Sequence, residues 1–317
     1  MTAGKTSNKT DPTFFVFDIA DPNNPSLVDK IDNDLIVLAG LNSVVVSREY
    51  AFVASASSYT RGQMQVVDLS SMSVKTFKVP IINPAGSSKG VGNSIFYKNG
   101  IIYLGLTKSD SENEFNIIDV LNPQTPFQRG SYSIGNAVNT IVVRNNFAYI
   151  ASPNSDKELV VLSVNDPVNP IEEESYNAPA GGTASGNGKS LYLVGNNLYF
   201  GRTVIHGKPE FYILNNTDST KIQTNNPDPT TQEVNISVDA LVVRDYLAFL
   251  LTKTQLQIWK IDHTTSPWSI TSYALPIILP ASGSFPEPSM DCEANRLYIS
   301  SNNSTGQGSI YIIKPGT

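Results

Sequence analysis

Hydrophobic residues along this chain occur in short runs of four to six, bounded by small polar residues. The runs are rich in β-branched and aromatic side chains, which suit a pleated strand, and no stretch follows a helical period. Two runs surround a short polar turn, a third follows a polar loop, and a more polar fourth completes each group. Four strands in about 50 residues is the arrangement of one β-propeller blade, so we expect an all-β propeller.

The groups fall into two alternating classes. The first class reads LNSVVVSREYAFVA from Leu41 and recurs from Val138 and Val238 without a gap. The second reads GVGNSIFYKNGIIYLGL from Gly90 and recurs from Gly186, with a weaker copy from residue 290. Because the classes alternate, the repeating unit is a pair of blades and the number of blades is even.

The spacing of equivalent residues predicts how many pairs the chain contains. Phe14, Phe115, Phe211 and Ile310 begin equivalent runs and are 101, 96 and 99 residues apart. Three pairs give six blades, in one domain over residues 14–317 that follows a flexible leader, residues 1–13. A ring of seven or eight blades, or a fragment of a larger ring, is the alternative.

The last group predicts closure of the ring by the N-terminal strands. It starts near residue 289 and ends without a fourth strand, which residues 26–31 can supply. One strand of the third type is then surplus, either residues 14–19 or residues 309–314. An unclosed ring would leave edges that aggregate, which favours closure.

The third run is followed by a proline-bounded turn that resembles the LVIVD-repeat proteins of bacteria and archaea. The turn reads FVFDIADPNNP from Phe15, IIDVLNPQTP from Ile117 and LSVNDPVNP from Leu162. The segments NFAYIAS from Asn146 and EYAFVAS from Glu49 are similar to the second strand of that family. The resemblance implies a β-propeller in an exported or cell-surface protein, and it says little about chemistry.

Composition excludes some partners. The net charge is −6 and the 22 basic residues are scattered, so we expect no nucleic-acid partner. The single cysteine, Cys292, permits no internal disulfide, and no apolar run is long enough to cross a bilayer. The polar, uncharged composition favours an extracellular or cell-surface monomer whose export segment has been removed, with a cytoplasmic location as the alternative.

Catalytic and metal-binding patterns are not apparent in the sequence. The two histidines, His206 and His263, belong to different groups, and the glycine loops at Gly90 and Gly186 precede strands rather than helices. The acidic run KSDSENE at residues 108–114 lacks the spacing of a calcium loop, so we interpret it as solvated charge. We therefore expect no catalytic residue, no metal ligand and no cofactor, with calcium as the weak candidate.

Loops at residues 55–63, 107–114, 201–208 and 301–308 should share one face with the loops that lead into the first strands. The candidate ligand-binding residues there are Tyr59, Arg61, Arg202, His206 and Asp239. Aromatic, amide and guanidinium groups suit a carbohydrate or a peptide surface. The sequence favours a non-catalytic recognition or adhesion domain. The alternatives are a metal-assisted hydrolase or lyase with a site at the channel mouth, and an intracellular interaction scaffold.

Overall fold

The computed structural model describes residues 12–32, 40–56, 62–178, 187–205, 207–215, 230–265, 268–279, 289–302 and 308–314. The regular elements of these residues are the β-strands β1 to β26. The chain divides into two compact units, one of residues 1–148 and 162–171 and one of residues 149–161 and 172–317. Within the described part, no helix is long and apolar enough to span a membrane.

The first unit begins with a two-stranded sheet and two four-stranded sheets. The two-stranded sheet contains β1 (Pro12–Asp18) and β2 (Ser26–Asp32). The next contains β3 (Leu41–Ser47), β4 (Tyr50–Ser55), β5 (Met64–Asp68) and β6 (Ser73–Phe77). The third contains β7 (Gly92–Lys98), β8 (Ile101–Leu106), β9 (Phe115–Asp119) and β10 (Phe127–Tyr132).

A further sheet takes residues from both units, and three lie in the second. The shared sheet contains β11 (Thr140–Arg144), β12 (Phe147–Ala151), β13 (Leu159–Ser163) and β14 (Ile171–Tyr176). Next come β15 (Gly188–Val194), β16 (Asn197–Arg202), β17 (Phe211–Asn215) and β18 (Thr230–Gln232). A five-stranded sheet contains β19 (Ala240–Arg244), β20 (Leu247–Leu251), β21 (Gln255–Asp262), β22 (Ser269–Ser272) and β23 (Ile277–Ile278). The last contains β24 (Ser289–Glu293), β25 (Arg296–Asn302) and β26 (Gly308–Ile313).

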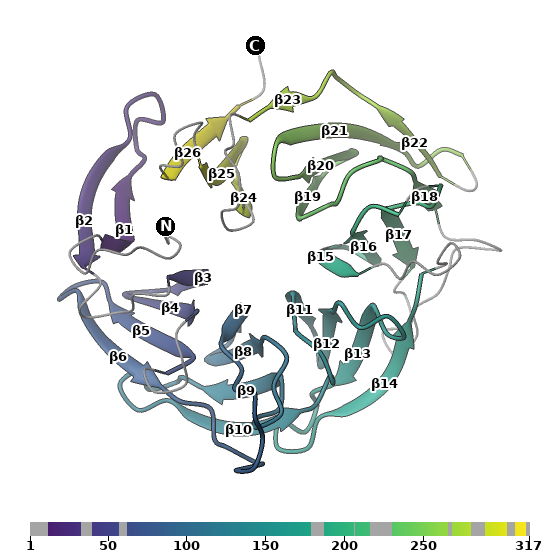
Figure 1. Ribbon diagram of the computed structural model, residues 1–317. Coiled ribbons are helices and arrows are strands. Elements are labelled where there is room, and N and C mark those ends of the chain that lie inside the picture. The colour runs from purple at the N-terminus through teal and green to yellow at the C-terminus, as the bar shows by residue number, and fades with distance from the viewer. Residues whose placement is uncertain are drawn as a thin grey trace. The chain divides into compact units, whose positions relative to one another are not determined.

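Each four-stranded sheet is a meander of consecutive strands, as Figure 1 shows for β7 to β10 and β15 to β18. This agrees with the four runs per group in the sequence. The sequence left open which of two strands was surplus, and the structure contains both. Strand β26 is the third strand of its own sheet, and β1 pairs with β2. Strand β1 begins at Pro12, two residues before the expected domain start, and most of the expected leader lies outside the described residues. The single domain stays a prediction.

The second and third strands of the four-stranded sheets supply most of the core. Strand β13 is buried along its whole length, and β4 is buried from Ala51 to Ser55. The turns that join first and second strands place Asn99, Asn145 and Asp245 at φ values of 50°, 51° and 54°. Asparagine and aspartate tolerate this left-handed conformation, which two-residue hairpin turns require. The turn residues therefore fix the register of these hairpins.

The proline-bounded turn after the third strand consists of two side-chain-capped turns in succession. Asp119 Oδ1 accepts a hydrogen bond from the main-chain N–H of Leu121 at 3.0 Å, and Asn122 Oδ1 accepts one from Gln124 at 3.1 Å. Asp and Asn side chains stabilise turns in this way. The same two bonds form at the turn between β1 and β2, where Asp18 and Asp21 are the acceptors. The motif that carries the family resemblance is thus a structural turn.

Candidate functional site

The first strands of three sheets begin with a β-bulge that carries a polar side chain. The pairing register shifts around Asn42, Asn93 and Lys189. Asn42 Nδ2 donates to the carbonyl oxygen of Gly92 at 2.7 Å, and Asn93 Nδ2 donates to that of Val138 at 2.9 Å. A bulge redirects the side chain it carries. Each amide therefore holds the beginning of the next first strand along the chain.

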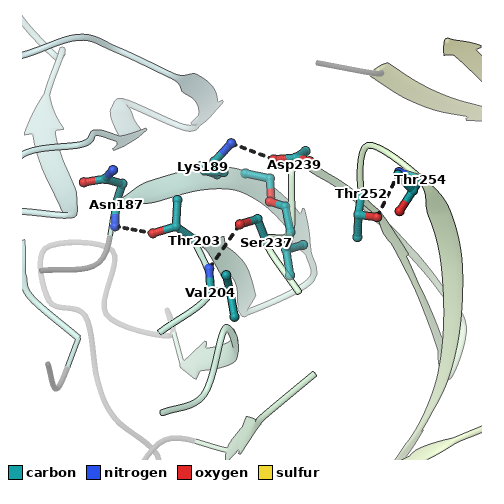
Figure 2. A network of polar contacts seen from close by, with 10 residues as sticks. Asn187, Lys189, Thr203, Val204, Ser237, Asp239, Thr252 and Thr254 are labelled. Carbon is teal, nitrogen blue, oxygen red and sulfur yellow. Dashed lines mark hydrogen bonds and ion pairs between the residues drawn. The ribbon is translucent and has the colours of Figure 1, made fainter. Parts of the chain in front are cut away.

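In the second unit, an ion pair takes the place of these amide contacts. Lys189 Nζ lies 2.6 Å from Asp239 Oδ1, and Figure 2 shows the two side chains pointing toward one another. The Lys189 side chain is 14% exposed and that of Asp239 is 2% exposed. The sequence placed Asp239 at the beginning of a first strand, but it gave no sign of this cation 50 residues away. The repeat shows only that Lys189 occupies the position equivalent to Asn93.

The loops next to these strands are joined by paired main-chain and threonine hydrogen bonds. The N–H of Thr203 donates to the carbonyl oxygen of Asn187 at 3.0 Å, and the N–H of Asn187 donates to Thr203 Oγ1 at 2.9 Å (Figure 2). Thr107 and Val91 form the same pair in the first unit, at 2.9 and 3.1 Å. In both sheets the residue just before the first strand is therefore fixed to the residue just after the second strand, and the common face of the loops stays a prediction.

Two further hydroxyl groups brace the same region of the second unit. Ser237 Oγ accepts a hydrogen bond from the N–H of Val204 at 3.1 Å, and Thr252 Oγ1 accepts one from the N–H of Thr254 at 3.3 Å (Figure 2). Besides the Lys189–Asp239 ion pair, the described part of this region therefore consists of neutral groups that hydrogen-bond to one another.

Part of the acidic run interpreted as solvated charge is buried, which corrects that interpretation. Glu112 and Glu114 are 3% and 1% exposed. Glu114 Oε2 accepts the N–H groups of Ile134 and Gly135 at 3.0 and 3.2 Å. Hydrogen bonds from main-chain groups compensate a buried carboxylate for its lost hydration. Lys108 and Asp110 in this run match the expected exposure.

Glu210 performs the same task in the second unit. Its Oε2 accepts the N–H groups of Val234 and Asn235 at 2.8 and 3.1 Å, and burial raises the pKa of its carboxyl group. Glu114 and Glu210 each precede the third strand of their sheet and are 96 residues apart. The sequence shows each glutamate directly before an apolar third strand, but that position did not distinguish a buried carboxylate from an exposed one. These carboxylates fix the segment that follows the fourth strand.

Arg202 belongs to a buried cluster rather than to an exposed loop. It ends β16, its Nη2 lies 2.6 Å from Glu158 Oε1, and the two side chains are 0% and 1% exposed. Its Nη1 donates to the Tyr212 hydroxyl at 3.3 Å. Burial raises the pKa of the Glu158 carboxyl group, and the neighbouring guanidinium opposes that rise. The contacts assign Arg202 a structural role, and its role as a ligand residue stays a prediction.

Asp239 follows Val238, whose N–H donates to the carbonyl oxygen of Arg202 at 3.0 Å, and the remaining candidates lie outside the described residues. Tyr59, Arg61 and His206 lie outside them. His263 follows β21 and is exposed, with its ring 4.1 Å from that of Trp268. Among the described residues, no group of three or more histidine, cysteine, aspartate or glutamate side chains could hold a metal ion. Of the five sequence candidates the structure describes only Arg202 and Asp239, and it pairs Asp239 with Lys189.

One family matches part of the chain. Residues 135–178, which include β11 to β14, match the LVIVD repeat. The match confirms the resemblance drawn from the proline-bounded turns for this part of the sequence. No curated protein matches the chain.

The chain is similar in fold to solved structures at low sequence identity. The AfRom2 CNH domain has a TM-score of 0.58 and 8% identity, with 100% of this chain and 98% of that chain covered. A functionally unknown protein from Desulfotomaculum acetoxidans has a TM-score of 0.62 and 9% identity, with 92% and 93% covered. The computationally designed Ika8 protein has a TM-score of 0.53 and 10% identity, with 88% and 74% covered. The likeness shows the fold alone, an all-β, six-bladed β-propeller.

Proposed function

We propose that this chain is a non-catalytic recognition module that binds a protein or a carbohydrate through the loops beside its first strands. The observation that carries the proposal is the reciprocal hydrogen bonding of Thr203 with Asn187 and of Thr107 with Val91. Loops that are already ordered lose less conformational entropy when a ligand binds. Fixed loops with neutral donors and acceptors suit ligands that are recognised by several hydrogen bonds rather than by charge.

The use of the acidic side chains supports binding over hydrolysis. Glu114 and Glu210 each direct Oε2 at two main-chain N–H groups, and Glu158 faces Arg202. A hydrolase needs carboxylates whose oxygens reach the substrate. The family resemblance and the polar, uncharged composition support an extracellular or cell-surface setting for this module.

We also propose that the six blades are three copies of a two-blade unit, and that β1 and β2 complete the sheet of β24 to β26. Glycines 96 residues apart support the repeat, because a Cβ at Gly92 or at Gly188 would lie 2.1 Å from the carbonyl oxygen of Gln63 or Glu158. Three strands in the last sheet and a surplus pair at the N-terminus support the closure. If β2 supplies the fourth strand of the sheet of β24 to β26, that sheet is left with no edge exposed by a missing strand.

Arrays of immobilised glycans and peptides test the recognition function with the purified chain. We expect saturable binding to at least one class, reduced about tenfold by Thr203→Val, which corresponds to about 1.4 kcal/mol. Thr76→Val, in an exposed position of β6, is the matched control and should bind like the original chain. Equal binding by both variants, binding to neither array, or turnover of a glycosidase or lyase substrate would contradict the proposal.

A further inference from the structure

The edge of the sheet formed by β19 to β23 differs in charge from the outer strands β6, β10 and β14. Residues 268–279 contain no charged side chain. The fourth strands of three other sheets carry Lys75 in β6, Arg129 in β10, and Glu172 to Glu174 in β14. Charged residues on an edge strand discourage pairing with foreign strands. The sheet of β19 to β23 lacks this protection along its outer strand.

A bulge in the outer strand displays the apolar residues of this edge. Strands β22 and β23 both pair with β21, with Ser272 opposite Trp259 and Ile277 opposite Leu256. The outer strand advances five residues from Ser272 to Ile277, while β21 covers three residues between their partners. The outer strand therefore contains two extra residues. The bulge is fixed at one end by the hydrogen bond from the N–H of Tyr273 to the carbonyl oxygen of Ile258, at 2.9 Å.

The side chains in and beside the bulge are exposed and apolar. The exposed fractions are 58% for Tyr273, 89% for Leu275, 39% for Ile277 and 70% for Ile278. At about 100 Å² for an aliphatic side chain and about 200 Å² for tyrosine, they present apolar surface on the order of 300 Å². We call residues 273–278 the apolar edge. This area is at the lower end of the largest apolar patches on monomeric proteins, which are often functional.

The size of the apolar edge decides between its candidate occupants. A stable dimer buries about 800 Å² on each partner, more than twice what this edge offers. A short peptide needs less buried apolar area than a second protein does, because it also gains main-chain hydrogen bonds when it adds to a sheet. Strand β22 supplies those bonds, since β21 is its only paired neighbour among the described residues. Pro276 has no N–H, so pairing is confined to β22 and the apolar side chains serve as anchors.

We propose that β22 and the apolar edge form a docking site for a short, extended, uncharged segment of another protein. The segment pairs with β22 and packs its apolar side chains against Tyr273 and Leu275. The two proposals are tested at different residues, Thr203 for the loops and Leu275 for the apolar edge, so either proposal can fail without the other.

Fluorescence anisotropy with labelled octapeptides tests the docking site. The probes are an uncharged, β-branched octapeptide, the same sequence with alternating lysine and glutamate, and the uncharged sequence with alternate main-chain nitrogens methylated. We expect the first to bind and the other two to bind at least tenfold more weakly. Leu275→Asp should weaken binding of the first peptide at least tenfold. Leu121→Asp, at a residue that is 73% exposed in the turn after β9, should not.

Other results would overturn the docking site. Failure of the uncharged peptide to bind the original chain would do so, as would equal binding to the Leu275→Asp and Leu121→Asp variants. Sedimentation showing a dimer that Leu275→Asp abolishes would assign the edge to a second copy of this chain. Binding to phosphatidylcholine vesicles that depends on Leu275, without peptide binding, would assign it to a lipid surface. Unfolding curves check that both variants are folded, which we expect because both positions are exposed.

Discussion

At the scale of single residues, the tightest constraints lie where the first strand of one sheet meets the residue before the third strand of the preceding sheet. Gly188 begins β15 at a position where a Cβ atom would lie 2.1 Å from the carbonyl oxygen of Glu158. A contact that short requires the main chain to move, because the atom it meets is not the end of a flexible side chain. Glycine is needed here for space, and the same argument applies to Gly92.

Gly188→Ala should lower the free energy of unfolding by about 1–3 kcal/mol through overpacking. Gly195 is the control, because it has φ of +54° and no atom within 4 Å of an added Cβ. Gly195→Asn should change stability by less than about 1 kcal/mol, since asparagine tolerates the left-handed region. Urea unfolding measures both variants, and a Gly188→Ala protein as stable as the original would contradict this reading of the contact.

The buried pair of Arg202 and Glu158 gives a second prediction for single residues. Arg202→Met leaves a buried carboxylate without its cation, and this should cost about 3–5 kcal/mol. Glu158→Gln in the same chain removes the uncompensated charge, so the double variant should be more stable than Arg202→Met alone. A double-mutant cycle from urea unfolding provides the measurement. Additive effects of the two substitutions would show that the pair does not act as a unit.

At the scale of elements, buried carboxylates connect the end of one sheet to its own third strand. Glu210 holds the segment after β18 and Glu114 the segment after β10. The sequence located both residues next to a third strand, but it could not distinguish a solvated carboxylate from one that accepts main-chain N–H groups. That distinction depends on where a segment about 20 residues further along the chain returns.

Glu210 predicts a pH dependence of stability. Burial raises the pKa of this carboxyl group above its ordinary value of 4.5, so the folded chain binds the proton more tightly than the unfolded chain. The free energy of unfolding contributed by Glu210 therefore falls as pH rises from about 4.5 through the raised pKa. Glu210→Gln keeps one oxygen for Val234 and Asn235 and removes the titration.

Urea unfolding between pH 4 and pH 8 measures this effect. The stability of Glu210→Gln relative to the original chain should rise with pH across that window. The aspartates that cap turns have the opposite effect at lower pH, where the free energy of unfolding falls as the pH falls. Hydrogen bonds from Ser70 and Thr264 lower the pKa values of Asp68 and Asp262, so their contribution is lost below pH 3.8 in both proteins. Parallel curves for the two proteins from pH 4 to pH 8 would refute a role for Glu210.

At the scale of the whole molecule, the six-bladed propeller fold requires more strands than the last sheet contains. Strands β24, β25 and β26 form a three-stranded sheet, and β1 and β2 form a two-stranded one. The proposed ring closure joins the two ends of the chain through these sheets. Repeat proteins depend on contacts between neighbouring units for stability, so an incomplete last unit should weaken the whole.

Removal of residues 1–32 should therefore lower the midpoint of thermal unfolding and broaden the transition. Removal of residues 1–11, which precede β1, is the matched control and should leave the midpoint unchanged. A synthetic peptide of residues 12–32 added to the shorter chain should restore part of the loss. Calorimetry measures all three samples, and identical transitions for the two truncated chains would count against closure by the N-terminal strands.

The sequence by itself determined the class of strands, their number per blade and the positions of the hairpin turns. These follow from local causes, because β-branched runs, turn residues such as Asn145 and the capped proline turns act over a few residues. The tertiary structure alone decided which polar residues are buried and what they contact. Lys189 meets Asp239, Arg202 meets Glu158, and the bulge before Pro276 displays Leu275, because the fold brings together or spreads apart residues whose local sequence is ordinary.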